Sequence, residues 1–229
     1  MNSKVLKYVD INPDTKPTAA IIWLHGLGVD GHDFVPIVPE LRMPETLPLR
    51  YVFPHAPRRS VTINAGMVMP AWFDILNLEG PHKVNENHIR ESAALLKTLL
   101  EYELLSGMPS ERVVLAGFSQ GGTIALHTGL RFEKKLAGIL ALSTYLPSAE
   151  SLETEASPVN RDIPILMAHG SEDPLVPIEN GQTTRENLTR LGYRVRWHTY
   201  PVEHTVCLDE INDIRDWLIH TLMDREQNE

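Results

Sequence analysis

The run Gly117-Phe118-Ser119-Gln120-Gly121-Gly122 constrains this chain more than any other segment, because of the residues on either side of it. The mostly apolar residues 112–116 before it predict a buried strand, and residues 123–127 after it predict the start of a helix. A serine at such a junction sits on a tight, strained turn that needs glycines around it, and the turn holds the hydroxyl at the carboxyl end of the sheet. The pattern G-x-S-x-G is weak alone, since a glycine-rich turn could simply pack a helix on a strand. The flanking strand and helix favour a turn that presents the serine hydroxyl.

Strand-like and helix-like segments alternate along the chain. Residues 19–24 are apolar throughout, which is typical of a strand buried on both faces, whereas residues 86–105 carry apolar side chains at the spacing of one helix face. This alternation predicts an α/β fold with a mostly parallel, twisted sheet and helices on both faces. The expected strands are 5–11, 19–24, 51–53, 112–116, 136–142, 163–168 and 194–200, and the expected helices are 86–105, 178–191 and 208–223, besides the one that begins at residue 123.

Two long stretches, 54–85 and 143–162, show little regular periodicity. Loops of this length inside a compact domain usually carry function or are disordered, and Trp72, Phe73 and Ile75 in the first stretch favour packed order there. No repeat, low-complexity tract or linker divides the 229 residues, so we expect a single domain over 1–229 with no separate lid domain. Residues 224–229 are expected to form a loose tail.

The charge balance and the single cysteine exclude several classes of protein. A formal net charge of −9, without a basic stripe, argues against binding to nucleic acid. Cys207 is the only cysteine, which leaves no disulfide framework and no cysteine-rich zinc site. The first residues lack the apolar core of a signal peptide, and no apolar run approaches the length of a membrane span. We therefore expect a cytoplasmic protein that is not embedded in a membrane.

A serine hydroxyl needs a general base to act as a nucleophile, and the base needs a third group that fixes its tautomer. In a fold with this turn the partners follow the serine in the order Asp or Glu, then His. Asp173 follows the expected strand 163–168 and His204 follows the expected strand 194–200. Both therefore fall at the carboxyl ends of strands, where Ser119 also lies. These three residues form the predicted catalytic triad.

Other residues could take two of these roles. His198 could be the base, but it lies inside the last expected strand, and His169 precedes a glycine at a strand end, where a structural hydrogen bond is the better interpretation. Glu172 could replace the aspartate. Cys207 could pair with the predicted base on one helical turn, although a cysteine there is more often a small buried hydrophobe.

Acyl transfer also needs N–H donors for the oxyanion. The backbone N–H of Gln120 supplies one, because this residue follows the serine on the turn. The second is expected from the loop after strand 19–24, where His25-Gly26-Leu27-Gly28 follows. Leu27 is the expected donor, with a glycine on each side that allows its amide to turn inward. As a loop without chemistry, the same four residues would be merely a flexible turn.

The chain resembles the carboxylesterase/phospholipase family of α/β-hydrolases, which includes the acyl-protein thioesterases. The resemblance runs nearly end to end and rests on residues 25–28, 70–75, 117–122, 169–170 with 173 and 176–177, and 203–204. It implies that the loop bearing Trp72 lines an acyl pocket and that homodimers are common. Thr144 departs from the glycine that the family often has before Tyr145, which concerns the shape of the neighbouring pocket wall. The roles that the resemblance implies are Ser119 as nucleophile, Asp173 as orienting group, His204 as base, and the amides of Leu27 and Gln120 as the oxyanion hole.

The candidate pocket walls indicate the class of substrate. Leu27, Trp72, Leu146 and Val176 are candidate substrate-binding residues, all apolar and therefore suited to an acyl chain. No cluster of His, Asp or Glu shows metal-ligand spacing, so no metal and no organic cofactor is expected. The sequence thus predicts a serine carboxylic-ester hydrolase that works through an acyl-enzyme on short- to medium-chain acyl esters, either small molecules or acylated substrates. Alternatives are an acyl-protein thioesterase or lysophospholipase with the same triad, a peptidase of the same fold, and a non-catalytic ligand-binding α/β-hydrolase.

Overall fold

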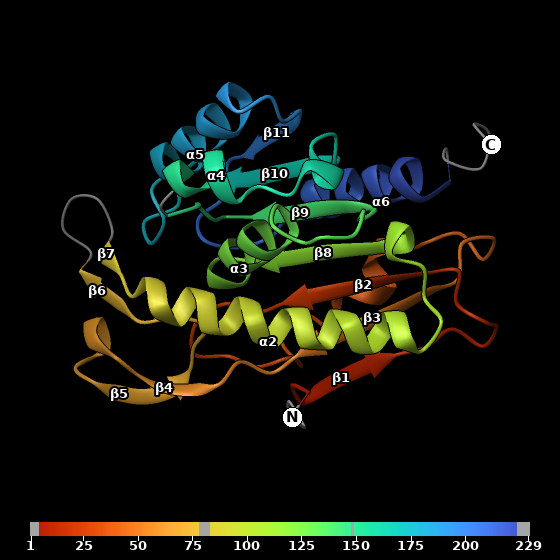
Figure 1. Cartoon of the computed structure of the whole chain (residues 1–229), viewed down its shortest axis with the longest axis horizontal. Coiled ribbons are helices and arrows are strands. Elements are labelled where there is room, and N and C mark those ends of the chain that lie inside the picture. Colours follow the sequence, from red (N-terminus) through yellow and green to blue (C-terminus); the bar gives the residue numbers. More distant parts are fainter. Residues whose placement is uncertain (1–4, 78–82, 148, 224–229) are drawn as a thin grey trace.

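The computed structural model, which describes residues 5–77, 83–147 and 149–223, is built on a seven-stranded sheet with the order β1-β3-β2-β8-β9-β10-β11 (Figure 1). Strand β1 lies at one edge and pairs with β3 antiparallel, while every other neighbouring pair in this sheet is parallel. The mostly parallel sheet predicted from the sequence is therefore confirmed. Its strands are β1 (Tyr8–Ile11), β2 (Ala19–Leu24), β3 (Leu49–Pro54), β8 (Val113–Phe118), β9 (Gly138–Leu142), β10 (Ile165–Gly170) and β11 (Val195–Tyr200).

Strand β2 shows how the sheet separates two hydrophobic cores. All six of its residues are buried, because β3 and β8 flank it and helices cover both faces. Alternate side chains of a strand point to opposite faces, so Ile22 and Leu24 belong to one core while Ile21 and Trp23 belong to the other. Packing on both sides fixes the point at which β2 ends and the next loop begins.

Helices cover both faces of the sheet. The core that contains Ile22 also receives side chains from α2 (Glu86–Leu105), α3 (Gln120–Gly129) and α5 (Ile178–Arg190). The core that contains Trp23 receives side chains from α1 (Ile37–Leu41) and α6 (Leu208–Met223). Figure 1 shows α2 running beside α3 across one face of the sheet.

Helix α2 begins and ends as the sequence predicts. Asn85 precedes it, and its side chain accepts a hydrogen bond from the His88 amide at 3.2 Å, which satisfies one of the free N–H groups of the first turn. Gly107 follows the helix with φ +98°, in the left-handed region that favours glycine.

The two stretches without periodicity contain short elements that the sequence does not predict. Residues 54–85 include two antiparallel strand pairs, β4 (Arg58–Val61) with β5 (Met67–Pro70) and β6 (Ile75–Asn77) with β7 (Lys83–Val84). Residues 143–162 include helix α4 (Leu152–Glu155) between two 3-10 turns, Ala149–Ser151 and Pro158–Asn160. The strands are short and mostly not buried, so they lack the alternation by which a half-buried strand is recognised.

In the described part of the chain the helices pack against this sheet, and no separate lid domain is present. Helices long and apolar enough to cross a membrane are absent from the same residues. The expected loose tail, residues 224–229, lies outside the described residues. The single domain over 1–229 stays a prediction.

Candidate active site

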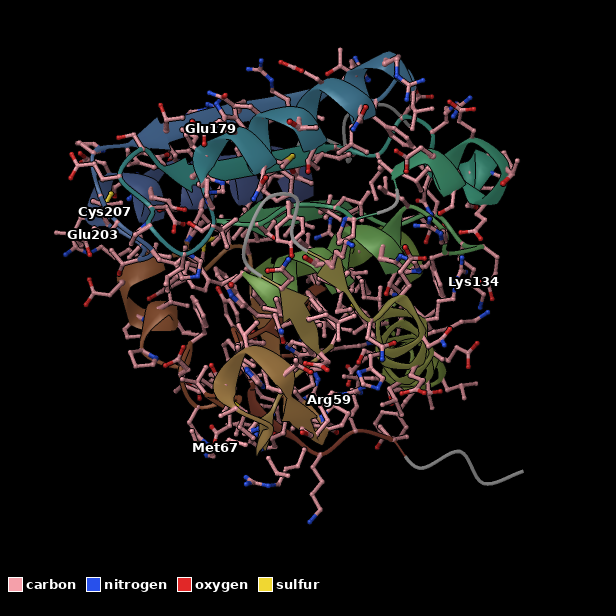
Figure 2. The ribbon with its side chains drawn as sticks, turned by 90° about the vertical axis from the view of Figure 1, so that its left-hand side faces the viewer. Arg59, Met67, Lys134, Glu179, Glu203 and Cys207 are labelled. Atoms are coloured by element: carbon pink, nitrogen blue, oxygen red, sulfur yellow. The ribbon has the colours of Figure 1, made fainter. Side chains whose placement is uncertain are left out.

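The loops that follow the parallel strands gather at one edge of the sheet. The arrowheads of β2 and β8 point to the left in Figure 1, so Figure 2, which shows the molecule from that side, looks onto this edge. Met67 of the β4–β5 pair and Glu203 of the loop after β11 lie toward the outside of this view. The predicted triad and one predicted oxyanion donor are in these loops: Leu27 after β2, Ser119 after β8, Asp173 after β10 and His204 after β11.

Ser119 occupies the turn between β8 and α3 with φ 54° and ψ −122°, a conformation that residues with a side chain rarely adopt. Its N–H donates to the Leu142 carbonyl at 2.9 Å, which ties the turn to β9. A Cβ at Gly117 would lie 2.3 Å from the Gly121 carbonyl oxygen, and a Cβ at Gly121 would lie 2.3 Å from the Leu24 carbonyl oxygen. Only glycine fits at these two positions. The strand, turn and helix predicted around this serine are confirmed.

His204 and Asp173 form a hydrogen-bonded pair. His204 Nδ1 lies 2.6 Å from Asp173 Oδ2, while Asp173 Oδ1 accepts the amides of Leu175 at 2.9 Å and Val176 at 2.8 Å. Burial alone would raise the pKa of Asp173, but the hydrogen bonds from His204 and from the Val176 amide outweigh it and lower that pKa. The carboxylate is therefore ionised near neutral pH, where it accepts Nδ1–H and leaves Nε2 of His204 as the proton acceptor.

The loops after β10 and β11 are in close contact, which places His204 beside the serine turn. A Cβ at Gly170 would lie 2.2 Å from the Glu203 carbonyl oxygen, so a side chain there would push the two loops apart. The His204 ring packs against the Phe118 ring with their centroids 4.6 Å apart. Phe118 directly precedes Ser119, so the imidazole is next to the turn although the two lie far apart in the sequence.

The alternative residues have other partners. His198 Nδ1 lies 2.9 Å from Asp213 Oδ2 on α6. His169 is fully buried, burial lowers its pKa, and the neutral ring lies with Nε2 2.8 Å from a backbone carbonyl of the following loop. Cys207 packs against the core on the α6 side, and Glu172 is exposed. Among these candidates the geometry favours the pair predicted from the sequence.

A cavity of about 490 Å³ opens beside the serine turn. Ser119 and His204 both line it, together with the expected oxyanion donors Leu27 and Gln120 and the expected wall residue Val176. Its other walls are largely apolar and include Val29, Ile63, Ile75, Phe118 and Leu175, with Asp33 and Asn64 as polar members. A cavity of this size and character suits an acyl chain.

Trp72 and Leu146, the other two expected wall residues, lie outside the lining of this cavity. Trp72 is fully buried, and its indole Nε1 donates to the His25 carbonyl at 2.9 Å. Leu146 lines a different cavity, of about 730 Å³, between the β6–β7 pair and α5. The sequence located an apolar loop near the site, but the ring of Trp72 packs into the core behind the site, and Ile63 and Ile75 supply the apolar wall instead.

Two side chains that the sequence analysis did not assign contact the site from behind. Thr144, which is buried, donates from Oγ1 to the Ser119 carbonyl at 2.7 Å. The threonine at this position, where the family often has glycine, therefore stabilises the serine turn and does not line the cavity. The side chain of Gln120 accepts the Trp72 amide at 2.9 Å and donates to the Phe73 carbonyl at 2.8 Å. Both are buried polar residues beside the end of a strand, and no local sequence pattern indicates the partners of their side chains.

Asp30, His32 and His55 form a cluster that could offer ligands to a metal ion, with one atom of each within 4.8 Å of the others. The sequence showed no such spacing because the loops after β2 and β3 meet only in the fold. His32 Nδ1 lies 2.9 Å from Asp30 Oδ1, and His55 Nδ1 accepts the Gly31 amide at 3.1 Å. A neutral imidazole that accepts at Nδ1 carries its proton on Nε2, so the His55 ring has no free lone pair for a metal in this arrangement.

Comparisons with known proteins identify the family and the fold of this chain. The sequence profile of the phospholipase/carboxylesterase family matches residues 8–222. A relative named acyl-protein thioesterase 1, from Neurospora crassa, is 41% identical over 214 residues, which cover 90% of this chain and 87% of that protein. Among solved structures, Arabidopsis thaliana SOBER1 gives a TM-score of 0.85 at 30% identity over 89% of this chain and 99% of that one. Zea mays acyl-protein thioesterase 2 gives a TM-score of 0.83 at 28% identity over 94% of this chain and 99% of that one. The chain belongs to the phospholipase/carboxylesterase family of hydrolases and has the α/β-hydrolase fold.

Proposed function

We propose that this protein is a serine carboxylic-ester hydrolase that works through an acyl-enzyme. The observation that carries the proposal is the shared cavity, which is lined both by Ser119 on its strained turn and by His204, whose Nδ1 is bonded to Asp173. Ser119 Oγ attacks the ester carbonyl while His204 Nε2 accepts the hydroxyl proton and then gives it to the leaving alcohol. Asp173 keeps the ring in the required tautomer and stabilises the imidazolium.

The tetrahedral intermediates need donors for their negative oxygen. The backbone amides of Leu27 and Gln120 are the proposed donors, since both residues line the cavity beside the serine. Water then attacks the acyl-enzyme with His204 as base, and the acid and the free serine are released. Val176, Ile63, Ile75 and Leu175 form the wall against which a short to medium acyl chain would lie.

The curated relatives favour a second candidate, hydrolysis of thioesters on acylated proteins. The matched relatives from Neurospora crassa and Cryptococcus neoformans are both named acyl-protein thioesterase 1. Esters and thioesters both pass through a tetrahedral oxyanion, so the same residues serve either reaction. A lysophospholipase would use them as well. The cytoplasmic location and the homodimer stay predictions.

The decisive experiment is labelling with a fluorophosphonate followed by kinetics on oxygen esters and thioesters that share one acyl chain. Ser119→Ala should abolish labelling and lower kcat by roughly 10⁴ to 10⁶, because the nucleophile, base and orienting group act as a unit. Activity of the variant within tenfold of the unaltered protein would rule out the proposal. The ratio of kcat/KM for the two substrate types then decides between esterase and thioesterase.

The wall proposed to contact the acyl chain can be tested separately, because the chain offers a matched control variant. Ile75→Ala should lower kcat/KM for octanoyl esters by roughly tenfold and leave acetyl esters almost unchanged, as expected when a few methylene contacts are lost. Leu146→Ala removes a similar number of carbon atoms from the other cavity. It should change both esters by the same factor. Chain-length dependence in Leu146→Ala, and none in Ile75→Ala, would show that the acyl chain lies in the cavity lined by Leu146, and would contradict the proposed wall.

A further inference from the structure

The proposed oxyanion donors lie beyond the part of the sheet that could hold them together. Strands β2 and β8 are neighbours, and their last paired residues are Leu24 and Gly117. Leu27 and Gln120 each lie three residues further along, where the two chains have left the ladder. An oxyanion hole requires both amides to lie within about 2.7–3.1 Å of one oxygen position. The backbone of Gly121 packs directly against the Leu24 and His25 carbonyls, which limits this separation, and hydrogen bonds to a third segment hold the two loops further.

Residues 70–73, which begin at the last residue of β5, are hydrogen-bonded to the serine turn through the Gln120 side chain. Gln120 is 3% exposed, and both polar atoms of its side chain are used: Oε1 accepts the Trp72 amide at 2.9 Å and Nε2 donates to the Phe73 carbonyl at 2.8 Å. A reversed amide would place N–H against N–H and oxygen against oxygen. The side chain is thus locked in one orientation against the main chain of this segment.

The same segment is hydrogen-bonded to the loop after β2 on both sides of Leu27. The Trp72 indole Nε1 donates to the His25 carbonyl at 2.9 Å, and the Gly28 amide donates to the Pro70 carbonyl at 2.9 Å. These two bonds bracket the Leu27 peptide. Trp72 is fully buried, so its contact with His25 is shielded from water.

We propose that Trp72 and the side chain of Gln120 are positioning residues that set the distance between the two donors of the oxyanion hole. The inference rests on the proposed function and adds a role to residues that do not touch the substrate through these side chains. Gln120 then acts twice, with its backbone N–H toward the oxyanion and its side chain toward residues 70–73. Trp72 acts on catalysis through the Leu27 loop and not as a wall of the acyl pocket.

Two variants test the proposal. Trp72→Phe removes the indole N–H but keeps a buried aromatic ring, and Gln120→Met keeps the side-chain length but removes both hydrogen bonds. Each should lower kcat at least tenfold with KM changed less than threefold, because a displaced donor weakens binding of the transition state more than binding of the substrate. Trp23→Phe is the matched control, since Trp23 is also fully buried while its indole nitrogen has no hydrogen-bond partner among the described residues.

A transition-state analogue separates positioning from a general loss of stability. Ser119 Oγ adds to the carbonyl carbon of a trifluoromethyl ketone, its proton passes to His204, and the carbonyl oxygen becomes an oxyanion in the hole. The corresponding secondary alcohol has the same chain and forms no oxyanion. In both variants the affinity for the ketone should fall by the same factor as kcat/KM, while the affinity for the alcohol stays within twofold.

The outcomes are distinguishable. Equal losses for ketone and alcohol, or a Trp72→Phe variant that matches Trp23→Phe in kcat and ketone affinity, would overturn the positioning role. If Gln120→Met does not fold, as judged by circular dichroism, Trp72→Phe decides alone. Failure of the proposed function would appear differently, as an unaltered protein that neither hydrolyses esters nor binds the ketone more tightly than the alcohol.

Discussion

At the scale of single residues, the peptide groups of Ser119 are held from two sides. Its N–H donates to the Leu142 carbonyl, and its carbonyl accepts the Thr144 hydroxyl at 2.7 Å. The Thr144 hydroxyl also lies 3.1 Å from the hydroxyl of Thr123 on α3. Groups from β9, from the loop after β9 and from α3 therefore fix the orientation of the serine. None of them contacts the substrate in the proposed mechanism.

Thr144→Val keeps the shape of the side chain and removes this donor. Loss of a buried hydrogen bond costs about 1 kcal/mol or somewhat more, so we expect kcat to fall about five- to twentyfold with a small loss of stability. Kinetics on one ester and urea unfolding measure both. Thr144→Ser keeps the hydroxyl and should retain most of the activity; equal losses in the two variants would show that the methyl group matters and the hydrogen bond does not.

Some features of the site follow from local sequence patterns, and others depend on the fold. The pairing of Asp173 with His204 was predictable because each follows a recognisable strand, and the carboxyl ends of parallel strands meet at one edge. The buried placement of Trp72 was not, because periodicity gives no side-chain direction in an irregular loop. The contacts of the Gln120 side chain are with backbone atoms 48 and 47 positions away in sequence, and no local pattern carries that information.

At the scale of elements, predictability follows length and burial. Helices α2 and α6 have the predicted bounds because each buries one face over several turns. The β4–β5 pair was missed, since Met67 and Val68 in β5 are more than half exposed and no apolar alternation marks the strand. Tertiary contacts, rather than propensity, order such short elements.

Helix α6 carries a buried carboxyl group that makes stability depend on pH. Glu210, in its first turn, is 1% exposed; burial raises its pKa from 4.5 to about 8, and the charge of Asp213 adds to the effect. The folded protein thus keeps a proton that the unfolded chain loses above pH 4.5. Stability contributed by this group therefore falls as pH rises from about 4.5 to 8, and the loss is complete above that range.

Glu210→Gln removes the titration while keeping the shape. Compared with the unaltered protein, the variant should gain stability progressively as pH rises, by on the order of several kcal/mol at pH 9 relative to pH 5. Urea unfolding at several pH values gives the two curves. Curves that run parallel from pH 5 to 9 would show that Glu210 ionises normally in the folded state.

At the scale of the whole molecule, one arginine connects the sheet to the helical layer. Arg50 on β3 bonds Glu103 on α2, with Nε 3.0 Å from Oε2, and also bonds Asp10 on the edge strand β1. Glu103 is 2% exposed. The alternation of segments predicted this layered arrangement, but neither the strand order nor a bond between residues 53 positions apart could be derived from it.

Arg50→Met should leave Glu103 as a buried charge without its partner and cost about 3–5 kcal/mol of unfolding free energy. Denaturant unfolding measures the loss. The double variant Arg50→Met with Glu103→Leu removes both charges and should recover much of it. A cost below about 1 kcal/mol for the single variant would mean that the pair behaves as an exposed one.

The strained backbone of Ser119 implies that the stability of the whole fold and the activity of the protein conflict at this residue. A φ of 54° with ψ −122° is unfavourable for any residue with a Cβ, by about 1–3 kcal/mol, and is readily adopted by glycine. Ser119→Gly should therefore melt at a higher temperature than Ser119→Ala, which keeps the Cβ, although both lack the nucleophile. Thermal unfolding of the two inactive proteins compares them directly. If glycine raises the melting temperature, selection for stability alone would remove the serine, and only selection for turnover would keep it.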